Sequence, residues 1–83
     1  MNEKTRRNTA VWTKGLINGF KFWVMHFDEG SMFGIDCGRI SKLEIRRQDT
    51  GERVVYYDRF WDMEPEPDSE EEAVYLELLA RFN

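Results

Sequence analysis

Alternating apolar and polar side chains over two neighbouring stretches predict a β-hairpin. Residues 10–17 and 20–27 are rich in aromatic and β-branched side chains, and Asn18-Gly19 separates them. Asn-Gly is the strongest short-range signal for a two-residue hairpin turn, because both turn positions need a positive φ. Such a turn pairs Gly15 with Phe22 and divides the side chains between two faces. The predicted core face carries Phe20, Phe22 and Val24, whereas the other face carries Trp12, Lys14, Lys21, Trp23 and Met25.

A second hairpin and a helix follow along the chain. Residues 39–47 alternate in the same way, and residues 48–52, which include Gly51, connect them to a fourth strand over residues 53–59. Residues 60–63 are expected to leave the sheet, and an extended segment with two prolines follows. Ser69 and Glu72 then form a possible capping box at the start of a helix. Its apolar stripe comprises Val74, Tyr75, Leu78, Leu79 and Phe82.

These elements predict an α+β fold in the order ββββα. We expect a four-stranded antiparallel sheet made of two hairpins, with one C-terminal helix packed on one face. Residues 10–83 would form a single domain, preceded by a flexible basic arm over residues 1–9.

Length and composition limit the class of protein. The 83 residues are 41% hydrophobic, which indicates one folded domain. No apolar run approaches the ~20 residues of a membrane-spanning helix, and no apolar segment follows the basic N-terminus as in a secretory signal. Cys37 is the single cysteine, so an internal disulfide is excluded and a cytoplasmic location is expected.

The candidate chemistry does not point to an enzyme. A structural zinc site requires four nitrogen or sulfur ligands, and His26 and Cys37 are the only histidine and cysteine of the chain. The segment Gly34–Arg39 lacks the glycine spacing and the following helix of phosphate-binding loops. We therefore predict no catalytic residues, no metal and no cofactor.

Charge is distributed unevenly between the two halves of the chain. The net charge is −4, yet residues 1–47 hold nine Lys and Arg against five acids, and residues 48–83 hold three against eleven. Such asymmetry indicates either a charged partner or attraction between the halves within the domain.

Two motifs stand out in the second and third quarters of the chain. The first consists of Glu29, Ser31, Phe33, Gly34, Ile35, Gly38, Arg39, Ile40, Ser41, Lys42 and Leu43, and the second of Tyr57, Asp58, Arg59, Trp61 and Asp62. Both motifs resemble those of a family of short uncharacterised proteins from Gram-positive bacteria and their phages. The resemblance covers most of the chain from Trp12 onwards, and it implies a phage or mobile-element setting without implying any chemistry. Members often have Gly where this chain has Cys37 or Phe60.

The first functional hypothesis rests on a run of acids. The positive N-terminus of a helix explains acids at residues 70–72, but it does not explain those on the preceding proline segment. A negative surface that docks on a basic host protein, such as a defence-system nuclease, would explain the whole run. The predicted partner-binding residues are Asp62, Glu64, Glu66, Asp68, Glu70 and Glu71, with Glu72 completing the run.

Other readings stay open beside it. Arg39, Lys42, Tyr57 and Arg59 could converge to bind a small anion or nucleotide, or the two arginines could merely pair with neighbouring acids. The Trp12 and Trp23 face, with Met25, is a candidate homodimer surface. Direct nucleic-acid binding is disfavoured by the net charge.

Overall fold

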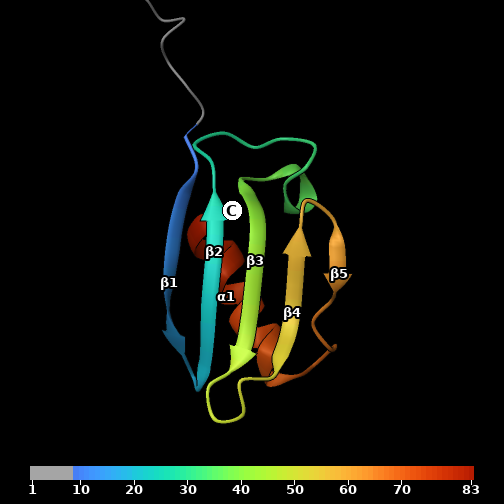
Figure 1. Cartoon of the computed structure of the whole chain (residues 1–83). Coiled ribbons are helices and arrows are strands. Elements are labelled where there is room, and N and C mark those ends of the chain that lie inside the picture. Colours follow the sequence, from blue (N-terminus) through green and yellow to red (C-terminus); the bar gives the residue numbers. More distant parts are fainter. Residues whose placement is uncertain (1–8) are drawn as a thin grey trace, which may run out of the picture.

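A computed structural model, which describes residues 9–83, shows a five-stranded antiparallel sheet with one helix behind it (Figure 1). The strands follow one another across the sheet in chain order, so every neighbouring pair is joined by a hairpin connection. Of the predicted basic arm, only Thr9 lies within the described residues. The elements are β1 (Val11–Ile17), β2 (Phe20–His26), a 3-10 turn (Ile35–Cys37), β3 (Ile40–Arg47), β4 (Arg53–Asp58), β5 (Trp61–Met63) and α1 (Glu70–Phe82).

The α+β class and the C-terminal helix are confirmed, but the prediction of four strands was wrong. Residues 61–63 were expected to leave the sheet, and instead they form β5 along β4, with Tyr57 aligned to Trp61. The chain reverses at Arg59, whose φ is +65°, and the N–H of Asp58 donates to the carbonyl of Phe60. No glycine or asparagine marks this reversal, and for that reason the turn was not predicted.

The predicted hairpin register is confirmed. Gly15 pairs with Phe22 and Ile17 with Phe20, and Asn18 and Gly19 both have positive φ. A Cβ on Gly15 would lie 3.0 Å from the Phe22 ring, so the missing side chain leaves the space that this ring occupies.

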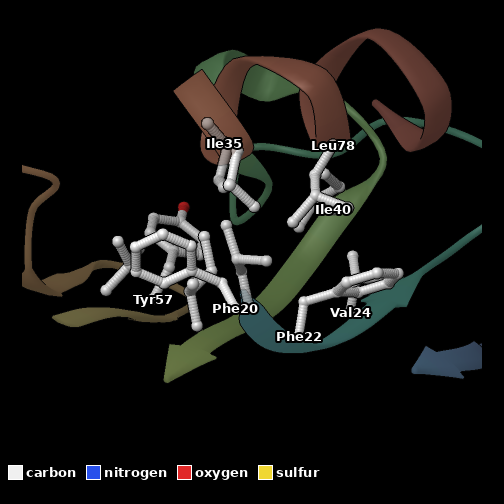
Figure 2. Close-up of a cluster of buried hydrophobic side chains, with 11 residues drawn as sticks. Phe20, Phe22, Val24, Ile35, Ile40, Tyr57 and Leu78 are labelled. Atoms are coloured by element: carbon white, nitrogen blue, oxygen red, sulfur yellow. The ribbon is translucent and has the colours of Figure 1, made fainter. Parts of the chain in front are cut away.

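The core lies between the sheet and α1. Phe20, Phe22 and Val24 from β2 are buried, as predicted. Figure 2 shows them in one cluster with Leu78 of α1 and with Ile35, which the loop before β3 contributes. In this way the loop is anchored by apolar contact to the same core as the helix.

Ser69 caps the start of α1 as predicted, but Glu72 reaches back one residue further than a capping box would have it, because the N–H of Ser69 donates to the carbonyl of Glu66. The Ser69 hydroxyl accepts from the N–H of Glu72 at 3.1 Å, and the Glu72 carboxylate accepts from the N–H of Asp68 at 2.8 Å. The first bond satisfies a backbone donor that the helix start would otherwise leave unpaired, and the second ties the residue before the N-cap to the first turn. On the helix stripe, Val74 and Leu78 are fully buried, whereas Tyr75, Leu79 and Phe82 pack partly buried around them.

Candidate functional site

Five carboxylates line one edge of the molecule, and we call them the acidic strip. They follow the chain from β5 along the connection that leads behind the sheet to the start of α1 (Figure 1). All five residues are exposed. The acidic strip consists of Asp62, Glu64, Glu66, Asp68 and Glu70.

The carboxylates of the strip form no ion pair within residues 9–83. Pro65 and Pro67 hold the residues before them extended, so Glu64 and Glu66 stand about 6–7 Å apart along the chain. Six ion pairs form among residues 9–83, and none of them includes a member of the acidic strip. The strip is therefore a row of negative charge that its own domain does not neutralise.

Glu71 and Glu72 do not belong to this surface. Glu71 is only 8% exposed, and its carboxylate lies 3.6 Å from the guanidinium of Arg47 at the end of β3. The Arg47 guanidinium also stands 5.5 Å from the centre of the Phe20 ring. Glu72 is half-buried and caps the helix. The structure thus gives Glu71, a predicted partner-binding residue, a contact that ties α1 to the sheet.

The four residues of the predicted anion site do not converge. Tyr57 is aligned with Leu43 and faces the core, where it is 5% exposed and its hydroxyl donates to the carbonyl of Phe33 at 2.8 Å. Burial, followed by the charges of Asp36 and Cys37, raises the pKa of the Tyr57 phenol above its ordinary value. Lys42 points to the opposite face of the sheet, where its ammonium lies 4.0 Å from Asp58. Tyr57 and Lys42 therefore cannot contact one small ligand.

Lys42 and Arg59 do meet, at a pocket of about 430 Å³ beside the loop before β3. Ser31 and Ser41 also line this pocket, and its apolar wall comes from Met25, Phe27 and Phe33. Arg39 does not line it. The pocket was not predicted as such, although Ser31, Phe33, Ser41, Lys42 and Arg59 all lie in the two motifs quoted above.

Comparison with known proteins places most of the chain in one family. A family model described as a domain of unknown function, DUF7678, matches residues 11–83. The chain belongs to this family. No curated protein and no solved structure matches it. The expected membership of an uncharacterised family is thereby confirmed, and DUF7678 itself brings no assigned activity.

His26 and Cys37, the histidine and cysteine considered as metal ligands, lie in different surroundings in this DUF7678 domain. The His26 ring packs 5.2 Å from the Phe82 ring, and Cys37 is exposed in the 3-10 turn. Within residues 9–83, no three or more His, Cys, Asp or Glu residues are grouped so that they could hold a metal ion. No helix of that same part of the chain is long and apolar enough to cross a membrane.

The predicted dimer surface lies on the face of the DUF7678 sheet opposite α1. Trp12 is 59% exposed there, and Trp23 and Met25 are half-buried. Tyr56 of β4 belongs to the same face, which sequence analysis did not point out. Strand alternation could have predicted the position of Tyr56, because successive side chains of a strand point to opposite faces and Tyr57 lies on the core face.

Proposed function

We propose that this DUF7678 protein is a small non-enzymatic interaction protein of phage or mobile-element type. It binds a basic host protein, such as a defence-system nuclease, through the acidic strip and thereby inhibits it. The observation that carries the proposal is the set of five exposed carboxylates that form no ion pair within residues 9–83.

Electrostatics supports a binding role for this row. The spacing of about 6–7 Å between Glu64 and Glu66 along the chain is less than the Debye length of about 8–10 Å, so their potentials add and the free protein bears the repulsion between them. A basic surface that docks there relieves the repulsion, and the combined field speeds the encounter. The Glu70 carboxylate is also favoured by the helix N-terminus, whereas the more distant Asp62, Glu64 and Glu66 gain little from it.

The test is capture of a basic protein from a Gram-positive bacterial lysate, with three versions of the tagged chain as bait. The strip variant carries Glu64→Lys and Glu66→Lys with Asp68→Asn, because Asp68 has a φ of +62° that Asn tolerates. The control changes charge by the same amount elsewhere, with Asp28→Lys, Glu77→Lys and Asp49→Asn. We expect the wild-type and control proteins, but not the strip variant, to retain a basic protein that high salt releases. Equal retention by all three baits would refute the role of the strip.

Inhibition is tested on the captured protein. If it is a nuclease, plasmid cleavage should stop at equimolar wild-type protein and continue with the strip variant. If cleavage is undiminished at a saturating concentration of the wild-type protein, the protein binds the nuclease without inhibiting it, and the proposed inhibition is contradicted.

The pocket beside Arg59 favours a second function, the binding of a small anion. Two cations and two serine hydroxyls meet above an apolar wall there, an arrangement that suits an anionic group attached to an apolar body. A thermal-shift screen of nucleotides and other anionic metabolites tests this function. A ligand at 100 times its Kd should stabilise the protein by about 2.7 kcal/mol, and Arg59→Gln should abolish the shift. A shift that survives Arg59→Gln would place the ligand elsewhere.

A further inference from the structure

Aromatic side chains cross the face of the sheet opposite α1, which we call the open face. No other element of residues 9–83 covers it (Figure 1). Cross-strand pairing aligns Trp23 with Glu44, Glu44 with Tyr56, and Tyr56 with Met63, so one row spans four strands. Trp12 lies diagonally beside Trp23, and with Tyr56 these two rings line a shallow hollow of about 130 Å³.

Cations surround these rings. Lys14 is aligned with Trp23, Lys21 with Leu16 and Arg46, and Arg46 with Arg53. Lys14, Lys21 and Arg53 form no ion pair with any residue between 9 and 83, and the Arg53 guanidinium stands 4.2 Å from the centre of the Tyr56 ring.

The remaining charges of the open face are largely paired. Lys42 lies beside Asp58, and Arg46 contacts Glu44. Asp62 adds a third carboxylate at the β5 corner, where it lines a pocket with Tyr56 and Asp58. Arg59 lines the same pocket and pairs with Asp58, so six cations stand against three carboxylates. The open face is positive although the whole chain has a net charge of −4.

We infer that the open face binds single-stranded nucleic acid. Exposed rings on a sheet offer stacking platforms for unpaired bases, and cations between the rings neutralise the phosphates. The net charge of −4 does not describe the open face, because the acidic strip runs along the β5 edge and the start of α1, and only its Asp62 reaches this face. The three unpaired cations lie on β1, β2 and β4.

A second copy of this chain is a poorer occupant of the same face. In a two-fold symmetric dimer the same patch meets itself, so two positive faces would be brought together. Such like-charge contact disfavours the dimer, whereas an anionic chain with flat bases complements both the charge and the rings.

The experiment is an anisotropy titration of fluorescein-labelled 20-nucleotide dT and rU oligomers with the full chain, at several salt concentrations. Three neutralised phosphates predict a slope of about −2 in a plot of log binding constant against log salt concentration. Trp12→Ala, at a side chain already 59% exposed, should weaken binding about tenfold. Lys14→Gln combined with Lys21→Gln should reduce the slope to about −0.7, and Arg81→Gln, on the outer surface of α1, should leave affinity and slope unchanged.

Four outcomes would overturn the inference. The first is the absence of oligomer binding at low salt, and the second is equal binding of inorganic polyphosphate with no effect of Trp12→Ala. The third is a concentration-dependent dimer in gel filtration that Trp12→Ala dissolves and the oligomer does not. In the fourth, a mononucleotide competes fully and Arg59→Gln, but not the lysine variant, abolishes binding, which would move the site to the pocket.

Binding of the oligomer to the open face should not require Glu64, Glu66 or Asp68 of the acidic strip. The strip variant should bind the oligomer at least as tightly as the wild-type protein, because it loses only negative charge. Weaker binding by the folded strip variant would contradict the placement of the nucleic acid on the open face.

Discussion

The side-chain oxygen of Asn83 accepts a hydrogen bond from the backbone N–H of Ile40 at 2.8 Å. The amide nitrogen of the same side chain donates to the carbonyl of Ile35 at 3.0 Å. Ile35 and Ile40 flank the turn that leads into β3, and both are fully buried. The side chain of Asn83, which follows α1, thus pairs with two backbone groups of the loop. It couples the end of the helix to the start of β3.

Asn83→Ala should destabilise the protein by about 1–3 kcal/mol, because the buried N–H of Ile40 loses its partner, whereas the carbonyl of Ile35 keeps the N–H of Gly38 at 2.8 Å. For a domain of this length, each kcal/mol lowers Tm by about 4–8 °C. Asn83→Asp should cost less, since it keeps the acceptor for Ile40. Thermal unfolding of the two variants checks both the size and the order, and an unchanged Tm for Asn83→Ala would show that the contact contributes nothing.

The Asn83 side chain occupies the space where a side chain at Gly38 would lie. A Cβ on Gly38 would overlap the Asn83 amide group, so Gly38→Ala should displace that side chain and break both of its hydrogen bonds. We expect the two substitutions to be non-additive, with Gly38→Ala costing at least 1 kcal/mol less in the Asn83→Ala background, as is common for contacting residues. Urea unfolding of the two single variants and the double variant measures this coupling, and additive free energies would contradict the overlap.

Local chemistry predicted the first hairpin and the helix start because single short signals decide them. Asn18-Gly19 sets a register that alternation then extends through Phe20, Phe22 and Val24. Ser69 and Glu72 mark the first turn of α1 in the same way. In each case the decisive partners lie within a few positions of one another.

The features that the sequence did not predict depend on residues distant along the chain or on an unusual backbone conformation. The turn at Arg59 uses a non-glycine residue at positive φ, and β5 is only three residues long. The Asn83 contact spans 43 positions and belongs to no local pattern. The separation of Tyr57 from Lys42 could have been predicted from strand alternation, since the two residues fall on opposite faces once β3 and β4 pair in the observed register.

Substitution of Glu71 should affect stability, whereas substitution of Glu66 should affect partner binding, although both residues belong to one run of acids. Glu71→Gln weakens the pair with Arg47 and should lower stability by about 1 kcal/mol, a value between those of exposed and buried pairs. It should leave capture of the basic partner unchanged. Glu66→Gln should leave Tm unchanged and weaken capture. Thermal unfolding and pull-down of both variants check this, and reversed effects would assign Glu71 to the binding surface.

Stability should fall at high pH through Tyr75. Burial, followed by Asp36 and other acidic neighbours, raises the pKa of its phenol from 10.0 to about 12. Because the folded state holds this proton more tightly than the unfolded state, its contribution is complete below pH 10.0 and is lost as pH rises toward about 12. Tyr75→Phe, with its stability at pH 7 as the reference, should show a shallower decline in urea unfolding between pH 9 and 11.5. Parallel declines would exclude Tyr75 as the source.

Arg59 occupies a backbone conformation that glycine would adopt more readily. Its φ of +65° carries a steric cost of about 1–2 kcal/mol for a residue with a Cβ, which the greater chain entropy of glycine in the unfolded state partly offsets. Its ion pair with Asp58 is exposed and adds little. Arg59→Gly should therefore leave the free energy of unfolding unchanged or raise it by up to about 1 kcal/mol. Arg59→Gln removes the same charge but keeps the Cβ, so it should bring no gain. If Arg59→Gly is stabilised and also loses the thermal shift with anions, the strained arginine serves the pocket at the expense of stability. A clear loss of stability in Arg59→Gly would instead show that the arginine side chain holds the turn.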